Sequence, residues 1–451
     1  MIRVSVLQTD LYQLTMMAAY AREGMNPRAT FELFVRKLPN NRNFLVCAGL
    51  EEALEALELL RFLPEEIEYL RGLPSFAHID ASFFDSLHTF RFTGDVWAVP
   101  EGEIVFAGEP LLRVTAPLLE AQLVETMLLS ILNMSTMIAS KAARIVLAAQ
   151  GRNVMEFGTR RAHGPEAGLL AARAAYIAGC VGTSNVEAGH LYGIPVLGTC
   201  AHSFIMSFES EEEAFKAYVA AFPEHATLLI DTYDTLEGAR RAARSTPNLR
   251  GVRLDSGDLA QLAKQVRVIL DEAGQPNARI VASNDLNEDK ISELLAANAP
   301  IDIFGVGTEL ATSKDAPALG GVYKLVAQED SLGHIRYVLK NSPDKPSYPG
   351  AKQIHRFFDP QGRALHDVIA LADEPVPPHA KPLLSCVMQG GKRTRPAPSL
   401  SQMQAHHKNA IACLPTALCA LSSSATYPVQ RSAKIDEARQ IALDAMPKST
   451  D

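Results

Sequence analysis

Between residues 151 and 325, short apolar runs repeatedly end in polar clusters. The runs are Asn153–Phe157, Ile194–Leu197, Thr227–Ile230, Gly251–Leu254, Arg279–Ala282 and Asp302–Gly305. The clusters that follow them are Gly158–Arg161, Gly198–Ser203, Asp231–Asp234, Asp255–Asp258, Ser283–Asp285 and Val306–Thr308. They supply two arginines, a histidine, several carboxylates and glycine-rich turns, a set that suits an anionic, phosphorylated substrate. The pattern predicts an enzyme.

Three residues in or next to these clusters have side chains suited to catalysis or binding. His202 follows an apolar run, where a histidine can act as base, acid or nucleophile, although an isolated histidine is more often buried and hydrogen-bonded. Arg160 can bond a phosphate or carboxylate through two N–H groups at once. Phe157 can stack on a planar ligand or simply belong to the core. These alternatives stay open at this point.

Turns supply the remaining candidates. Gly305, Gly307 and Thr308 form a small-residue turn whose backbone can approach an anion, although glycine turns are common. Asp255 and Asp258, three residues apart, can bind sugar hydroxyls or Mg²⁺, or form an ordinary turn. Polar side chains also occur at Ser283–Asp285, and Gly182–Asn185 is typical of a turn that opens a helix.

An alternation of buried strands with helices would bring these clusters together. Buried parallel strands read as continuous apolar runs. In an α/β barrel, the residues beyond the strands' carboxyl ends meet on one face, where active sites lie. Before this series, helical spacing follows Thr9-Asp10, Thr30–Val35 alternates like a strand, and Phe90–Ala116 indicates a small sheet. After it, a loop-rich region from Lys340 ends in a helix near Ser432–Ala445.

Composition narrows the class of protein. The chain has 451 residues, enough for two domains or a barrel with additions, and its net charge of −8 argues against a general nucleic-acid binder. Its six cysteines show no metal-binding spacing and no disulfide framework, which fits a reducing cytosol. The most apolar stretch, Leu118–Ala149, is interrupted by charges, including Lys141 and Arg144. We therefore expect a cytoplasmic protein without a membrane span.

Several longer motifs resemble the nicotinate phosphoribosyltransferase family. The resemblance runs from Thr9-Asp-Leu-Tyr-Gln-Leu-Thr15 to Tyr427-Pro428-Val429. Its most specific motifs are Glu156-Phe-Gly-Thr-Arg-Arg161, Gly182-Thr-Ser-Asn-Val186, Gly198-Thr-Cys-Ala-His-Ser203, Gly251-Val-Arg-Leu-Asp-Ser-Gly-Asp258, Phe304-Gly-Val-Gly-Thr308 and Leu319-Gly-Gly-Val-Tyr-Lys-Leu325. No motif is broken at a catalytic position.

The resemblance implies a fold and a reaction. The fold is α/β: an irregular α/β barrel of the type II phosphoribosyltransferases, with an N-terminal open-faced α/β sandwich completed by C-terminal segments. The implied division is 1–150 for the sandwich domain with a linking helix, 151–339 for the catalytic barrel, and 340–451 for segments that pack on both. The implied reaction joins nicotinate and 5-phosphoribosyl pyrophosphate, with ATP hydrolysis and Mg²⁺, in the salvage of nicotinate for NAD biosynthesis.

The resemblance also implies residue roles. His202 matches a histidine that ATP transiently phosphorylates, and Tyr12 and Phe157 match an aromatic pair around the pyridine ring, with Tyr12 from the other subunit of a homodimer. The groups that match holders of the ribose and its phosphates are Arg160, Arg253, Asp255, Asp285, Gly305, Gly307 and Thr308. Ser184 stands where nicotinamide-using relatives carry Asp, which favours the acid as substrate.

Three alternative functions remain at the level of sequence. Nicotinamide phosphoribosyltransferase is the nearest, and Ser184 argues against it. Quinolinate phosphoribosyltransferase needs a more basic pocket for two carboxylates. A non-catalytic sensor of phosphoribosyl ligands would bind without releasing pyrophosphate, and the intact His202 argues against it. The Mg²⁺ ligands, and the roles of Lys340, Lys345, Lys352 and Gly390–Arg395, are left open: these basic groups either reach phosphates or face solvent.

Overall fold

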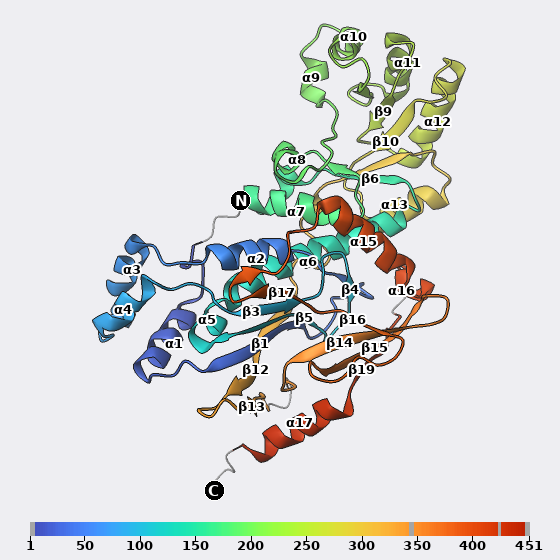
Figure 1. Ribbon diagram of the computed structural model, residues 1–451. Helices are drawn as coiled ribbons and strands as arrows, with labels where there is room; N and C mark the ends of the chain where they lie inside the picture. The colour runs from blue at the N-terminus through green and yellow to red at the C-terminus, as the bar shows by residue number, and fades with distance from the viewer. Residues whose placement is uncertain (1–4, 342–346, 423–424, 447–451) are drawn as a thin grey trace. The chain divides into compact units, whose positions relative to one another are not determined.

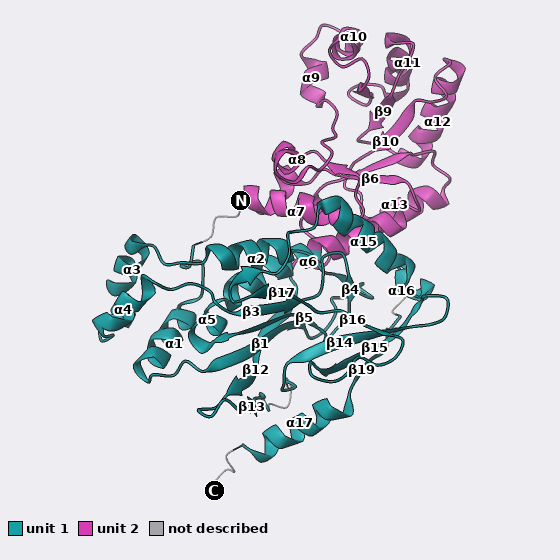
Figure 2. Cartoon of the chain, in the orientation of Figure 1, with its two compact units in different colours: residues 1–137, 318–451 teal, residues 138–317 magenta. Residues whose placement is uncertain are grey.

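The computed structural model describes residues 5–341, 347–422 and 425–446. The chain divides into two compact units (Figure 2). Unit 1 contains residues 1–137 and 318–451, and unit 2 contains residues 138–317. The three-part division expected from the resemblance, with boundaries after residues 150 and 339, stays a prediction.

Unit 2 is built on a six-stranded parallel sheet with the order β7-β6-β11-β10-β9-β8. Its strands are β6 (Asn153–Glu156), β7 (Gly182–Thr183), β8 (Thr227–Leu229), β9 (Gly251–Leu254), β10 (Arg279–Ala282) and β11 (Ile303–Val306). Most of their residues are buried, as the continuous apolar runs predicted. The sheet curls without closing into a full barrel (Figure 1).

One predicted strand of this series was wrong. Residues 194–197 form only an isolated bridge, between Val196 and Thr183, and the strand in this position is β7. Pro195 lacks a backbone N–H and can only accept, which it does from the Thr183 N–H at 3.0 Å. Because Pro195 cannot donate the next backbone hydrogen bond of a ladder, the pairing ends after the single bridge between Val196 and Thr183.

The helices of unit 2 lie between the strands, except the last, which follows β11. They are α7 (Pro165–Ile177), α8 (Val186–Tyr192), α9 (His202–Met206), α10 (Glu211–Ala221), α11 (Thr235–Ser245), α12 (Leu259–Glu272), α13 (Glu288–Ala296) and α14 (Thr308–Ala311). Five of them, α8 and α10 to α13, begin at a residue whose side chain caps the helix. Asn185 accepts from the Ala188 N–H and Asp258 from the Gln261 N–H, so these side chains serve as helix caps. For Asp258 the cap replaces the ligand role that its spacing from Asp255 allowed.

Unit 1 contains a seven-stranded antiparallel sheet with the order β13-β12-β1-β5-β3-β17-β18. Its strands are β1 (Arg28–Val35), β3 (Asp95–Ala98), β5 (Pro110–Pro117), β12 (Gly321–Glu329), β13 (Ile335–Tyr337), β17 (Ser385–Gln389) and β18 (Lys392–Arg393). The alternating run at residues 30–35 therefore forms a strand, as predicted. Strands from both ends of the chain share this sheet.

C-terminal segments complete unit 1. A four-stranded sheet joins β14 (Lys352–Phe358), β15 (Ala364–Leu371), β16 (Ala380–Pro382) and β19 (Val429–Arg431), and β2 (Leu45–Val46) pairs with β4 (Ile104–Val105). The helices are α1 (Leu11–Arg22), α2 (Leu50–Leu59), α3 (Pro64–Arg71), α4 (Ala81–Leu87), α5 (Leu118–Leu123), α15 (Leu400–Ala412), α16 (Thr416–Cys419) and α17 (Ala433–Asp444). α5 packs on β1 and β5. The predicted α/β class and architecture are confirmed.

The longest helix, α6 (Glu125–Ala148), begins in unit 1 and ends in unit 2. Among the described residues it alone has the length and apolar composition of a membrane span. Within its most apolar window 78% is buried by other parts of the protein, as expected for a core helix. Its charged residues Lys141 and Arg144 are also buried.

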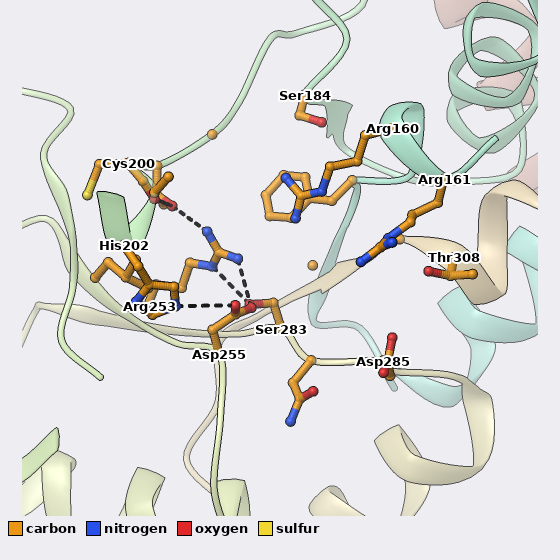
Figure 3. A pocket seen from close by; sticks show the side chains of 18 residues that line it. Arg160, Arg161, Ser184, Cys200, His202, Arg253, Asp255, Ser283, Asp285 and Thr308 are labelled. Carbon is orange, nitrogen blue, oxygen red and sulfur yellow. Dashed lines mark hydrogen bonds and ion pairs between the residues drawn. The ribbon is translucent and has the colours of Figure 1, made fainter. Parts of the chain in front are cut away.

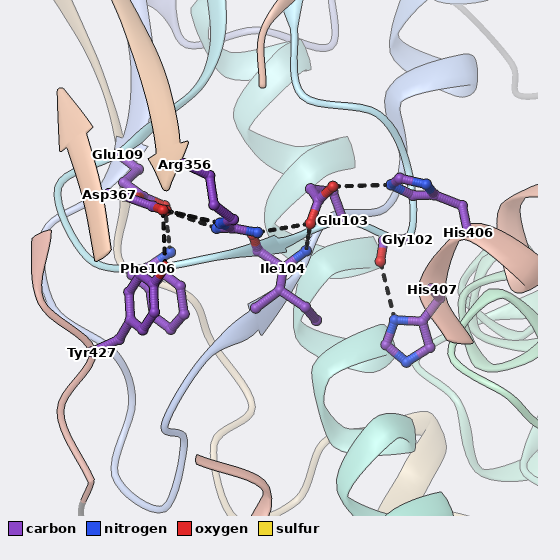
Figure 4. Close-up of polar contacts among 10 residues, drawn as sticks. All are labelled: Gly102, Glu103, Ile104, Phe106, Glu109, Arg356, Asp367, His406, His407 and Tyr427. Carbon is purple, nitrogen blue, oxygen red and sulfur yellow. Dashed lines mark hydrogen bonds and ion pairs between the residues drawn. The ribbon is translucent and has the colours of Figure 1, made fainter. Parts of the chain in front are cut away.

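A buried ionic cluster joins distant segments inside unit 1 (Figure 4). The Arg356 guanidinium donates to both Asp367 oxygens, at 3.0 Å from Nε and 2.7 Å from Nη2, and to Glu103 at 2.8 Å. Glu103 also contacts the His406 Nε2 atom at 3.1 Å. Burial opposes ionisation of Glu103, but His406 and Arg356 outweigh it and lower its pKa to about 2.

This pKa predicts a loss of stability in acid. A carboxyl group whose pKa is lowered on folding stabilises the protein above its unfolded pKa, and that contribution disappears as the pH falls through the folded pKa. Between pH 5 and pH 3, wild type should lose about 2 kcal/mol more unfolding free energy than Glu103→Gln, which takes up no proton there. Urea denaturation at both pH values measures this. Glu65→Gln, at an exposed position, should behave as wild type, and equal pH slopes for wild type and Glu103→Gln would refute the prediction.

Candidate active site

A pocket of about 380 Å³ lies at the carboxyl ends of the parallel strands in unit 2 (Figure 3). Ten of the eleven predicted site residues line it: Phe157, Arg160, Ser184, His202, Arg253, Asp255, Asp285, Gly305, Gly307 and Thr308. They come from six separate strand ends or loops, which the parallel sheet brings to one edge. Their individual roles stay predictions.

The Arg253 guanidinium organises one wall of the pocket. It donates to Asp255 Oδ1 at 2.8 Å, to Ser283 Oγ at 2.9 Å and to Thr199 Oγ1 at 2.9 Å. Ser283 also bonds the same Asp255 oxygen. Burial opposes the charge on Asp255, but the Ser283 hydrogen bond and the Arg253 charge prevail and lower its pKa. Asp255 is therefore an ionised carboxylate held in a fixed direction.

His202 is held at both sides of its ring. It begins α9, its Nδ1 atom lies 3.1 Å from the Thr232 hydroxyl, and its Nε2 atom lies 3.7 Å from Asp255 Oδ2. Its side chain is 39% exposed, so the ring remains accessible from the pocket. The hydrogen bond at Nδ1 helps to fix the ring orientation, and the Nε2 atom faces the Asp255 carboxylate within the pocket.

Two residues behind His202 were not selected from the sequence. Asp231 accepts from the Asp255 N–H at 2.8 Å and from the Ser256 hydroxyl at 2.6 Å, and Thr232 contacts His202. Both follow the apolar run that forms β8, which is the same signal that identified the other clusters. Their role is to hold residues of the pocket, and a strand-end position alone does not distinguish such a role from direct lining.

Close backbone packing fixes the aromatic side of the pocket. The Phe157 ring occupies the space beside Gly305, where an added Cβ would lie 2.6 Å from two ring carbons. The Phe157 N–H donates to the Val306 carbonyl at 2.8 Å. Beneath this turn, the buried carboxylate of Glu156 accepts from the Gly158 N–H and from the Thr183 hydroxyl. Glycine at 305 therefore gives the ring room, in addition to any part it has in binding anions.

The pocket carries an excess of positive charge. Arg160, Arg161 and Arg253 line it together with the carboxylates of Asp255 and Asp285. Arg160 and Arg161 lie on a short 3₁₀ helix, Thr159–Arg161, and are exposed, so both guanidiniums are accessible to a ligand. Arg161 was not among the predicted site residues. This balance favours an anionic ligand.

The loop Ser283–Asp285 has an unusual backbone. Asn284 and Asp285 have φ values of 104° and 44°, in the left-handed region that residues other than glycine seldom adopt. Such conformations persist where surrounding contacts enforce them, and they concentrate at ligand-binding sites. The Ser283 N–H is fixed to the Leu254 carbonyl at 2.9 Å, and Asp285 lines the pocket.

The carboxylates of the pocket suit Mg²⁺ bound together with substrate phosphates. Within the described ranges, no group of three or more His, Cys, Asp or Glu side chains is arranged to hold a metal ion. Mg²⁺ commonly keeps several waters and binds through one or two carboxylates and the substrate's phosphates. Asp255 and Asp285 provide such carboxylates, and Asp285 is the more exposed of the two.

The other predicted residues lie in unit 1. Tyr12 is on α1, where it is 47% exposed. Lys352 is buried and paired with Glu32 at 2.7 Å, so it does not face solvent. Arg393, in the segment 390–395, is paired with Glu51 and Glu58. Lys345 lies outside the described residues, and the role of Lys340 stays open.

The sequence matches three parts of one enzyme family. The family models are the nicotinate phosphoribosyltransferase (NAPRTase) N-terminal domain over residues 7–133, the NAPRTase family over residues 152–327, and the nicotinate phosphoribosyltransferase C-terminal domain over residues 376–439. A nicotinate phosphoribosyltransferase of Mycobacterium tuberculosis is 45% identical over 440 residues, covering 96% of this chain and 92% of the relative. One of Bacillus subtilis is 44% identical over 380 residues, covering 82% and 77%.

Two solved structures have folds similar to that of this chain. Human nicotinic acid phosphoribosyltransferase is 30% identical with a TM-score of 0.84, covering 97% of this chain and 100% of the human chain. A nicotinate-nucleotide pyrophosphorylase from Pyrococcus furiosus, 24% identical with a TM-score of 0.73 over 90% of this chain and 96% of its own, shares the fold.

Proposed function

The chain belongs to the nicotinate phosphoribosyltransferase family, and we propose that it transfers the phosphoribosyl group of 5-phosphoribosyl pyrophosphate to nicotinate. The ring nitrogen of nicotinate forms a bond to ribose C1, and the bond from C1 to the pyrophosphate oxygen breaks with its electron pair. The products are nicotinate mononucleotide and pyrophosphate. This reaction belongs to NAD biosynthesis.

One observation carries this proposal: ten residues from six segments, five of which carry a family motif, line a single cationic pocket. The reaction requires nucleophile and electrophile to be held in line, and it requires donors for the charge that develops on the leaving group. Guanidiniums and the backbone of the Gly307–Thr308 turn suit the second task. A wall with an aromatic ring suits the first, because nicotinate is planar.

Nicotinate is assigned to the side of the pocket formed by Phe157, Arg160 and Ser184. The Phe157 ring stacks on the pyridine ring, and a guanidinium pairs with the nicotinate carboxylate. Ser184 lines the pocket near Arg160 (Figure 3). A hydroxyl group can donate to a carboxylate, whereas an acidic residue at this position would repel it.

The phosphoribosyl substrate is assigned to the adjoining wall, which meets the Phe157 ring at Gly305. Arg253 and Asp255 are locked together and offer a guanidinium and a ribose-hydroxyl acceptor in fixed directions. Asp285 and the turn Gly305–Thr308 complete this wall. Mg²⁺ would be held by Asp285 and Asp255 with the substrate's pyrophosphate, and it would neutralise charge on the leaving group.

We also assign an ATP-coupled step to His202. The Nε2 atom would attack the γ-phosphorus of ATP, so that an N–P bond forms and the P–O bond breaks with its electron pair on ADP. Water later hydrolyses the phosphohistidine. The partial exposure of His202 in the pocket, the Thr232 contact at Nδ1 and the Asp255 carboxylate beside Nε2 support this assignment. A phosphoryl group beside Arg253 and Asp255 would change the charge of the phosphoribosyl site.

We further place the enzyme in the cytoplasm as a homodimer in which Tyr12 enters the partner's pocket. On α1, Leu11, Tyr12 and Met16 are exposed by 49%, 47% and 36%. Neighbouring apolar side chains on one exposed helix suit a surface that another subunit covers. Tyr12 would then face Phe157 across the nicotinate ring.

The alternatives are less well supported. A nicotinamide-using enzyme needs an acceptor for the amide N–H groups, and Ser184 offers only a hydroxyl in place of a carboxylate. A non-catalytic sensor needs no accessible histidine next to an ionised aspartate, yet His202 and Asp255 are 3.7 Å apart in the pocket.

Ser184→Asp tests the substrate. Wild type with Mg²⁺ should release pyrophosphate with nicotinate and far less with nicotinamide, and EDTA should stop this release. The new carboxylate should lower kcat/KM for nicotinate by about a hundredfold, because like-charge contacts cost several kcal/mol. Ser184→Asn, which is neutral, is the matched control. If wild type prefers nicotinamide, or if both variants respond alike, the assignment of Ser184 is wrong.

His202→Ala tests ATP coupling. Without the imidazole no phosphoryl group can be accepted, so ATP should no longer stimulate the reaction, while slow transfer remains. Acid-labile phosphate on the wild-type protein should map to residue 202 after incubation with ATP. His190→Ala, in α8 and outside the pocket-lining set, is the control. Equal ATP stimulation in His202→Ala and wild type would contradict the role.

Co-expression of Tyr12→Ala and Arg253→Ala tests the shared site. Each variant alone should be nearly inactive. If Tyr12 enters the partner's pocket, a mixed dimer has one site with both defects and one with neither, so random assembly should restore about a quarter of wild-type activity. If Tyr12 serves its own subunit, every site carries a defect and no activity returns.

A further inference from the structure

Lys141 is a buried cation at the end of α6 that lies in unit 2. Its side chain is 2% exposed, and an ammonium group without partners at such a position would cost several kcal/mol. Its Nζ atom lies 2.6 Å from Glu288 Oε2, 3.0 Å from Asp315 Oδ1 and 3.8 Å from Glu309 Oε2. One charge therefore joins acidic side chains from three segments. None of these four residues lines the pocket.

Two of these partners lie directly beyond loops of the pocket. Glu288 is the first residue of α13, three positions after Asp285. Glu309 is the second residue of α14, next to Thr308. The loops that precede these helices provide five lining residues of the phosphoribosyl wall, namely Ser283, Asn284, Asp285, Gly307 and Thr308. Lys141 thus contacts the far ends of both loops from behind.

The loop at 283–285 requires such support. Its residues Asn284 and Asp285 have positive φ values, and such conformations persist where surrounding contacts enforce them. At one end the Ser283 N–H is fixed to Leu254. At the other end Glu288 is held by Lys141 and by Arg144, whose Nε donates to it at 2.9 Å.

The charges of the cluster are balanced. Lys141, Arg144 and Lys314 face Glu288, Glu309 and Asp315, which gives three cations and three anions. Removing Lys141 leaves an excess of buried negative charge behind both loops. The carboxylates would then separate or take up protons, and either response moves the helix starts to which the loops are attached.

We propose that Lys141 is a positioning residue that sets the spacing of the two loops that hold the phosphoribosyl substrate. The proposal rests on the function assigned above. It predicts a larger effect on one substrate, because Lys141 pairs with the helices that follow both loops of the phosphoribosyl wall, whereas none of its three ion-pair partners lies on the segments of Phe157, Arg160 and Ser184.

The test is the steady-state kinetics of Lys141→Met, which keeps the side-chain length and removes the charge. KM for 5-phosphoribosyl pyrophosphate should rise about tenfold or more, because small displacements of binding groups have large kinetic costs. KM for nicotinate should stay within about twofold of wild type. Lys141→Arg, which restores the charge with a different reach, should recover part of the affinity and also serves if Lys141→Met does not fold.

Lys352→Met is the matched control. Lys352 is another buried lysine, 7% exposed and 2.7 Å from Glu32, but it lies in unit 1. Both methionine variants should lose thermal stability, and only Lys141→Met should change KM for the phosphoribosyl substrate. A calorimetric titration with pyrophosphate gives a second measure that does not depend on turnover, and the affinity should fall in parallel with the rise in KM.

The outcomes separate this proposal from the assigned function. If wild type does not convert nicotinate and 5-phosphoribosyl pyrophosphate, the assigned function fails. If wild type is active and Lys141→Met has wild-type KM and pyrophosphate affinity despite lower stability, Lys141 is merely structural. A change of the same size in Lys352→Met, or an equal rise in both KM values, also overturns the positioning role.

Discussion

The active site depends on one constraint, which is the parallel hydrogen bonding among the six strands of unit 2. Strands paired in parallel end at the same edge, so residues that are far apart in sequence meet there. The register fixes this meeting closely, since Val281 is opposite both Arg253 and Ile303. The strands are short and mostly buried, so few polar side chains lie within them; Arg253 in β9 and Glu156 in β6 are two that do. Most of the polar chemistry lies in the residues that follow, where the backbone is free to turn.

Buried charges then determine how these ends are held. Arg253 donates to three side chains from three loops, and Lys141 contacts three acidic residues in unit 2. In unit 1, Arg356 joins Glu103 and Asp367 in the same way. A buried charge tolerates little displacement of its partners, because separation leaves it unpaired in a medium of low polarity. Ionic contacts therefore specify geometry here more than they add stability. The apolar core provides the bulk of the folding free energy.

Sequence patterns predicted the features of this protein that depend on residues close together in the sequence, such as strands and the residues at their ends. Apolar runs located five of the six parallel strands, and the runs with the clusters after them contain nine of the ten pocket residues. Ser184 was identified only through the family resemblance. The pattern failed at residues 194–197, because Pro195 interrupts a ladder that hydrophobicity alone favours. Lys141 was visible only as a charge that interrupts an apolar helix. Its partners are more than 140 residues away, and neither spacing nor composition indicates which distant carboxylates a buried lysine meets. Asp231 and Thr232 belong to a predicted strand-end cluster, but that position alone did not indicate that they hold other residues of the pocket.

The fit of the Phe157 ring against Gly305 has a consequence for how this sequence can vary. The ring fills the volume that a side chain at 305 would need, so the two positions share one space. Enlarging residue 305 requires a smaller or displaced residue at 157, and each single change passes through a poorly packed intermediate. Substitutions at these positions should therefore be correlated among homologues. Residue 305 in the strand and residue 157 in the aromatic wall of the pocket therefore constrain each other's substitutions.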